Sequence, residues 1–213
     1  MALSLRLILG SISLAVIVTL VVVVAIWTPD RSVESLKTRW AKPPSQFVSL
    51  DGMEVHVRDE GPQDDPSPIV LLHGSGASLH TWDRWVSLLK NDHRVIRLDR
   101  PGFGLTGPNP SGDYSMAFNA KFTKEFLDHM QIRHCTLVGN SSGGRVAWQV
   151  AAAYPDRVDH LVLLASGGYP RTTPLPTGLK IASSPLFGRV LEHILPRSSV
   201  EKGLRASFAI PLK

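Results

Sequence analysis

The stretch LVGNSSGG, residues 137–144, places a serine in a glycine-rich turn directly after an apolar run. Gly139, Ser141 and Gly143 fit the pattern Gly-x-Ser-x-Gly. A serine hydroxyl attacks a carbonyl carbon when a sharp strand-to-helix turn exposes it, and flanking glycines permit the strained backbone of such a turn. The helix that follows would favour negative charge at its N-terminus. The stretch therefore predicts Ser141 as a nucleophile; the alternatives are an ordinary crossover loop and attack by Ser142.

Strand-like and helix-like segments alternate on both sides of this turn. Short, continuously apolar runs are typical of strands buried on both faces, and segments with apolar residues at helical spacing separate them. The strand-like runs are residues 69–74, 93–102, 134–140 and 158–168, and the helix-like segments are residues 80–91, 115–132 and 143–155. Ahead of them, two alternating runs flank Asp51-Gly52, which predicts a hairpin. The pattern predicts an α/β fold with a mostly parallel sheet and helices on both faces.

A second glycine-rich loop, HGSG at residues 73–76, follows the first apolar run. In an open sheet of this kind, loops at the carboxyl ends of the strands form the site. An oxyanion hole needs two backbone N–H groups directed at one point. We predict that Ser142 supplies one of them and that Ser75, next to Gly74, supplies the other. For His73 we favour a structural role, in which the imidazole fixes the loop by hydrogen bonds, over a catalytic role.

Three motifs, LLHGSGAS…TWDRW, RLDRPGFGLT and LVGNSSGG, occur in an order and spacing that resemble the α/β-hydrolase family. The turn at Ser141 is similar to that of the branch of meta-cleavage-product hydrolases, esterases and perhydrolases, and the match covers Phe47–Gly168. The resemblance implies a serine hydrolase that cleaves an ester or another activated carbonyl of a small apolar substrate without a cofactor. Hydrolysis of a carbon–carbon bond in a dienoate is a further alternative. Branches with Asp at the nucleophile position are disfavoured.

The resemblance also implies a triad acid and a histidine after the turn, usually beyond a helical cap. Residues 169–213 resemble the beginning of that cap, so we expect the acid and histidine positions to be absent from these 213 residues. The candidates that follow Ser141 are Asp156, Asp159, His160, Glu192, His193 and Glu201. The first three precede the strand at 161–164 and are expected about 15–20 Å from Ser141. A second hypothesis is therefore a catalytically incomplete fragment that serves as a membrane-tethered binding or interaction module.

The N-terminal part of the chain predicts a membrane anchor. Residues 7–27 contain no charged residue and would span roughly 31 Å as a helix, close to the thickness of bilayer hydrocarbon. A buried core helix and a cleaved signal peptide are the alternatives. The predicted organisation is a single-pass anchor at 1–28, a linker at 29–45, a hydrolase core at 46–168 and the start of a cap at 169–213. Basic residues after the span favour a cytoplasmic location for the domain that follows. The length of that domain and the scarcity of charge before the span are also compatible with a signal anchor that exports it, so the side of the membrane is left open.

Composition excludes several other classes. The net charge of +5 is modest, and no basic block is interleaved with aromatic residues, so we predict no nucleic-acid partner. The segment GFGLTG matches a dinucleotide-binding pattern, but Pro108 and Pro110 follow where a helix should begin. Cys135 is the single cysteine and is expected to be a small core residue. The histidines show no metal-ligand spacing, and we predict no metal site. The predicted partners are a small-molecule substrate and, through residues 7–27, a membrane; the oligomeric state stays open.

Overall fold

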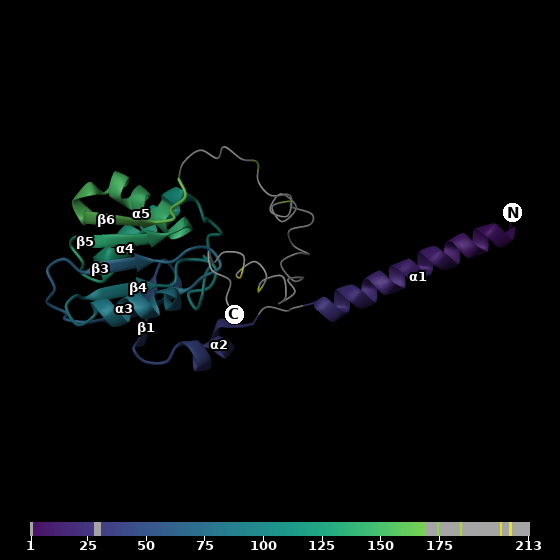
Figure 1. Ribbon diagram of the computed structural model, residues 1–213, viewed down its shortest axis with the longest axis horizontal. Helices are drawn as coiled ribbons and strands as arrows, with labels where there is room; N and C mark the ends of the chain where they lie inside the picture. Colours follow the sequence, from purple (N-terminus) through teal and green to yellow (C-terminus); the bar gives the residue numbers. More distant parts are fainter. Residues whose placement is uncertain are drawn as a thin grey trace. The chain divides into compact units, whose positions relative to one another are not determined.

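The structure is a computed structural model that describes residues 2–27 and 31–168, with residues 174, 184, 201 and 205. The chain divides into two compact units, and the unit Ser32–Pro170 contains a six-stranded sheet in the order β1-β2-β4-β3-β5-β6 (Figure 1). The strands are β1 (Ser45–Leu50), β2 (Met53–Glu60), β3 (Ile69–Leu72), β4 (Val95–Leu98), β5 (Cys135–Asn140) and β6 (Val158–Leu164). Strands β4, β3, β5 and β6 run parallel, so the predicted mostly parallel sheet is confirmed.

The first two strands form the predicted hairpin. β1 pairs antiparallel with β2, and the turn residues Asp51 and Gly52 both have positive φ angles, of 50° and 73°. Two positive φ angles are typical of the tight turn whose twist matches that of the flanking strands. β2 then pairs antiparallel with β4, which joins the hairpin to the parallel part of the sheet.

Helices cover both faces of the sheet, as the alternation predicted. On one face, α4 (Met116–His129) and α5 (Ser142–Ala153) pack on Val70, Leu72 and their neighbours. On the other, a 3₁₀ turn η1 (Leu79–Trp82) and α3 (Asp83–Leu89) pack on Leu71. Because successive strand residues point to opposite faces, a strand covered on both sides must be apolar throughout. This explains the continuous apolar run of β3.

The strand β6 lies at an edge of the sheet. It pairs with β5 on one side, and no strand within the described ranges pairs with its other side. Leu161, Val162 and Leu163 are 38%, 37% and 43% exposed. Unprotected apolar edge strands favour pairing with another strand. Within the part of the chain that the structure describes, β6 is therefore an exposed apolar edge of the sheet.

The segment predicted as a linker, residues 29–45, is instead partly helical. Helix α2 (Val33–Trp40) begins at Ser32, whose Oγ accepts a hydrogen bond from the Ser35 N–H at 3.3 Å. The Trp40 ring lies 5.5 Å from that of His80, and the Trp40 carbonyl accepts a hydrogen bond from His80 Nε2 at 3.1 Å. The capping serine was a local signal for this helix, but the polar, proline-containing composition of the segment favoured a linker.

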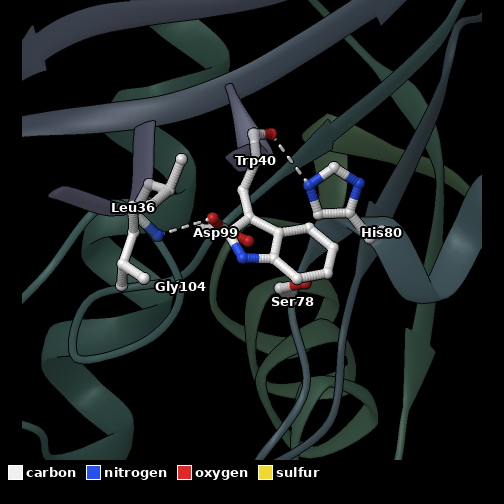
Figure 2. Close-up of a pocket in the computed structure, with 7 residues that line it drawn as sticks. Leu36, Trp40, Ser78, His80, Asp99 and Gly104 are labelled. Carbon is white, nitrogen blue, oxygen red and sulfur yellow. Dashed lines mark hydrogen bonds between the residues drawn. The ribbon is translucent and has the colours of Figure 1, made fainter. Parts of the chain in front are cut away.

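Helix α2 lines a cavity of about 200 Å³ together with the loops that follow β3 and β4 (Figure 2). In the figure the Trp40 ring lies between the His80 ring, to which the Trp40 carbonyl is hydrogen-bonded, and the Asp99 carboxylate. The residues that line it are Leu36, Trp40, Ser78, His80, Asp99, Gly104 and Leu105. The predicted linker thus contributes to the packing of the folded unit.

Residues 7–26 of the uncharged N-terminal segment lie in helix α1 (Ala2–Ile26), which also contains Arg6. Over the residues that the structure describes, no helix combines the length and the apolarity that crossing a membrane requires. The predicted anchor is not confirmed. The predicted cap at 169–213 lies outside the described residues, apart from the four single positions named above.

Candidate active site

The turn at Ser141 joins the end of β5 to the start of α5. Ser141 has φ 51° and ψ −115°, and its side chain is exposed. Its backbone N–H donates to the Leu164 carbonyl at 2.9 Å, which ties the turn to the end of β6. A positive φ is uncommon for a residue with a side chain, and such strain gathers at functional sites. The predicted sharp turn and the exposure of the serine are both present.

The glycines of this turn permit contacts that no side chain would allow. A Cβ on Gly139 would lie 2.5 Å from the Gly143 carbonyl oxygen, so the strand and the helix meet backbone to backbone. A Cβ on Gly143 would fall on the Leu72 carbonyl and 2.5 Å from the His73 carbonyl. The first turn of α5 therefore packs directly on the end of β3, where the HGSG loop begins.

The two predicted oxyanion loops come together beside Ser141. A Cβ on Gly74 would lie 3.2 Å from Ser141 Cβ, and Ser75 Oγ donates to Ser142 Oγ at 3.0 Å. Ser142 is the first residue of α5, a position whose N–H has no partner within a helix. The four predicted site residues, Gly74, Ser75, Ser141 and Ser142, thus lie in one place at the carboxyl ends of β3 and β5.

His73 is buried beneath this loop and uses both ring nitrogens. Nδ1 lies 2.8 Å from the Gly74 carbonyl and therefore donates to it, and Nε2 accepts from the Arg100 N–H at 3.1 Å. Burial lowers the pKa of His73 from 6.5 to about 4, so the ring is neutral at pH 7. This arrangement agrees with the structural role that we favoured from the sequence.

The lowered pKa of His73 predicts acid sensitivity. Below pH 6.5 the unfolded chain takes up a proton that the folded protein does not take up until about pH 4, so stability falls across this window. The shift corresponds to about 3 kcal/mol of unfolding free energy. Urea unfolding at pH 7 and pH 4.5 samples most of this window, so we expect the fall in unfolding free energy to be smaller by about 2 kcal/mol in His73→Gln and unchanged in the exposed control His129→Gln. An equal fall in unfolding free energy between the two pH values in both variants would contradict the assignment.

Arg100 is a functional candidate that the sequence analysis missed. It is 4% exposed, and its Nη2 donates to Ser142 Oγ at 2.8 Å. Its guanidinium lies 4.9 Å from the centroid of the Phe103 ring, and its Nε has no hydrogen-bond partner. Burial lowers the pKa of Arg100 from 12.5 to about 10. The sequence signal for Arg100 was its position just after the carboxyl end of β4, at the edge of the sheet where the loops after β3 and β5 also lie.

A second group of polar residues anchors the loop after β4. His56 Nδ1 lies 2.7 Å from Asp99 Oδ2, and His56 Nε2 lies 2.8 Å from Ser45 Oγ. Burial raises the pKa of Asp99, but hydrogen bonds from His56, Leu105 and the Leu79 N–H outweigh it and leave the pKa lowered. His56 and Asp99 are 0% and 1% exposed, so we interpret this Ser–His–Asp chain as structural.

The glycine pattern GFGLTG has its explanation in this loop. A Cβ on Gly104 would fall on the Asp99 carboxylate, so residue 104 must be glycine for the loop to close over Asp99. No helix starts there; the segment is a turn with a bridge between Phe103 and Gly107. The pattern serves packing around Asp99, consistent with our rejection of a dinucleotide site.

The carboxylates and imidazole at the start of β6 lie away from Ser141, as expected. Asp159 Oδ2 accepts from Ser67 Oγ at 2.9 Å and lies 2.5 Å from His134 Nδ1. Ser141 contacts the opposite end of the same strand. Among the described residues, no imidazole is hydrogen-bonded to Ser141, and no group of His, Cys, Asp and Glu could hold a metal ion. Glu192 and His193 lie outside the described residues.

Comparisons with known proteins identify relatives of the chain. It is 35% identical over 150 residues to the cis-3-alkyl-4-alkyloxetan-2-one decarboxylase of Shewanella oneidensis, covering 68% of this chain and 46% of that protein. It is 34% identical over 148 residues to a 2-hydroxy-6-oxononadienedioate/2-hydroxy-6-oxononatrienedioate hydrolase of a Pseudomonas species, covering 64% and 51%. The chain thus spans about half the length of the curated relatives it matches.

The fold has solved counterparts. The crystal structure of Cfl2 from Burkholderia cenocepacia aligns with a TM-score of 0.66 at 25% identity, covering 78% of this chain and 61% of that one. Residues 67–197, more than half of the chain, match the family described as alpha/beta hydrolase fold. With the sheet order and the turn at Ser141, this match shows that the chain belongs to the alpha/beta hydrolase fold family.

Proposed function

We propose that the protein is a serine hydrolase that cleaves an ester or another activated carbonyl of a small apolar substrate. Ser141 would attack the carbonyl carbon, and the backbone N–H groups of Ser142 and Ser75 would bind the oxyanion that forms. One observation carries the proposal. Ser141 is exposed on a strained turn, at the N-terminus of α5 and against the loop of Gly74.

The mechanism also needs a base within hydrogen-bonding reach of Ser141 Oγ. The His73 imidazole lies under the neighbouring HGSG loop, and both of its ring nitrogens are already used. The base and the acid that orients it would therefore come from outside the described residues. Without them, only a weak rate enhancement from the oxyanion donors would remain.

The names of the relatives bear on the substrate. The Pseudomonas relative is named for hydrolysis of an oxo-dienedioate, and the Shewanella relative for decarboxylation of an oxetanone. An oxetan-2-one and an oxo-dienedioate each contain a carbonyl group. Ester cleavage remains the proposal, and hydrolysis of a carbon–carbon bond in a dienoate is the alternative that the Pseudomonas relative favours.

A substrate comparison tests this proposal. The longest natural protein that contains this chain is incubated with 4-nitrophenyl butyrate and with a 2-hydroxy-6-oxo-dienoate, and product release is followed by absorbance. We expect turnover of the ester, absent from Ser141→Ala. Turnover of the dienoate alone would replace the ester proposal by the carbon–carbon alternative. No turnover of either compound by a folded protein would favour the second hypothesis, a non-catalytic binding module.

We also propose that the N-terminal segment anchors the protein in a membrane. The support is the absence of charge over residues 7–27 and the helical conformation of residues 7–26 within α1. Two arginines at the centre, Val16→Arg with Leu20→Arg, should release the protein from membranes, because each costs about 2.5–3.5 kcal/mol at a bilayer centre. Thr38→Arg adds one such charge on α2 and should leave the protein bound. Sodium carbonate extraction measures both, and retention of the double variant would refute the anchor.

A further inference from the structure

The site holds a buried cation, Arg100, that has no counter-ion among the described residues. Two buried arginines, Arg97 within β4 and Arg100 two residues after its end, differ in whether a carboxylate pairs with them. Arg97 is 2% exposed and pairs with Glu60 and Asp83. Arg100 is 4% exposed, and no carboxylate among the described residues lies within ion-pair distance of it. A buried, unpaired charge is costly to a fold. A buried charge without a carboxylate partner among the described residues is a candidate for binding an anionic ligand.

The neighbours of Arg100 show where that ligand would lie. Its Nη2 donates to Ser142 Oγ at 2.8 Å, and Ser75 Oγ lies 3.0 Å from the same oxygen. Ser75 is exposed and Ser142 is half-buried, whereas the guanidinium lies beneath them against Phe103. The two hydroxyls therefore connect the buried charge to the surface beside Ser141.

The protons of this group can be counted. A guanidinium donates and never accepts, so Arg100 supplies the proton of its bond to Ser142. The two hydroxyls carry one proton each, and the bond between them uses one. Whichever hydroxyl donates, one O–H is left without a partner within the group. That O–H is polarised by the cation behind it, which makes it a stronger donor.

We propose that Arg100, Ser142 and Ser75 form a binding site for an anionic oxygen next to Ser141, in which the hydroxyls donate and Arg100 supplies the charge. The inference rests on the proposed function for its biological use, since the anionic oxygen would be the oxyanion formed on attack or a carboxylate of the substrate. Arg100 acts through Ser142 and is therefore a positioning residue. Binding itself needs neither the attack of Ser141 nor a base.

Equilibrium binding tests the site without catalysis. The full-length protein is titrated with methylphosphonate, a tetrahedral anion, with acetate, a planar carboxylate, and with neutral methanesulfonamide, by calorimetry. We expect at least one of the two anions to bind, and we expect methanesulfonamide not to bind. Binding of methylphosphonate alone assigns the site to the tetrahedral oxyanion, and binding of acetate assigns it to a substrate carboxylate. If neither anion binds, even at ten times the concentration at which methanesulfonamide is tested, the proposal is overturned.

Variants separate this site from general electrostatics. Arg100→Gln should weaken anion binding at least about 10-fold, and Ser142→Ala should weaken it several-fold, because a charge-assisted donor is lost in each. Arg145→Gln removes an equal charge from the exposed face of the same helix end and should change binding less than about twofold. Equal losses in Arg100→Gln and Arg145→Gln would overturn the proposal.

A stability measurement keeps the test valid if a variant folds poorly. Because an unpaired buried cation destabilises a fold, Arg100→Met should melt at the same or a higher temperature than the wild type while losing anion binding. A lower melting temperature together with unchanged binding per folded molecule would show that Arg100 only supports packing. Failure of the hydrolase proposal would appear differently, as anion binding that persists in a protein without turnover.

Discussion

Replacing Ser141 by alanine is expected to lower kcat/KM for ester hydrolysis at least about 10³-fold in the longest natural protein that contains this chain. The hydroxyl is exposed at the tip of the turn, and alanine fits the same backbone without a new contact. The loss should therefore appear in kcat, with KM changed little. Initial rates with 4-nitrophenyl butyrate, normalised to the folded fraction, measure it.

Ser142→Ala is the matched control for this prediction. The two serines are adjacent, and each variant removes one hydroxyl at the N-terminus of α5. The alanine variant keeps the backbone N–H at position 142, so only the side-chain donor is lost. We expect kcat/KM to decrease about 10- to 100-fold. A larger loss in Ser142→Ala than in Ser141→Ala would mean that the roles of the two serines are reversed.

Replacing Gly143 by alanine should produce the largest change in stability. The added Cβ would fall on the Leu72 carbonyl and lie 2.5 Å from the His73 carbonyl. Both neighbours are backbone atoms of a buried strand end, which cannot turn away as a side chain could. The helix must then separate from the sheet, and we expect a loss of about 3–5 kcal/mol in unfolding free energy, at the upper end of single substitutions.

Gly76→Ala provides the comparison for the Gly143 prediction. Gly76 has φ +67°, but a Cβ there would have nothing within 4 Å. Its cost should be that of the backbone conformation alone, about 1–2 kcal/mol. Urea unfolding of both variants measures the difference. Similar costs at the two positions would show that close packing of α5 on β3 is not what requires glycine at 143.

The sequence was sufficient to predict the elements whose apolar pattern reflects which of their faces are buried. The run at residues 69–72 is apolar throughout because β3 is covered on both faces, and Asp51-Gly52 supplies the two positive φ angles of the hairpin. The convergence of Gly74, Ser75 and Ser141 followed from parallel strands whose carboxyl ends meet at one edge. These features depend on local chemistry and on one rule of topology.

Other features depend on contacts between distant parts of the chain. Helix α2 is held by Trp40 against His80, a contact across 40 residues that no local pattern reveals. That no carboxylate of the described residues pairs with Arg100 depends on which residues surround it in space, which a local pattern does not show. His56 looked like one residue of an alternating strand, and only the fold places Asp99 beside it. The triad base could not be located because Ser141 has no imidazole partner among the described residues.

The central claim is that Ser141 is the activated nucleophile, and covalent labelling tests it most directly. The longest natural protein that contains this chain is treated with a fluorophosphonate, digested, and mapped by mass spectrometry. We predict a single phosphonyl adduct on the peptide that contains Ser141, with the modified atom assigned to Ser141 by fragmentation, and no adduct in Ser141→Ala. An adduct on Ser142 or Ser45, or none in a protein that hydrolyses the ester, would contradict the claim.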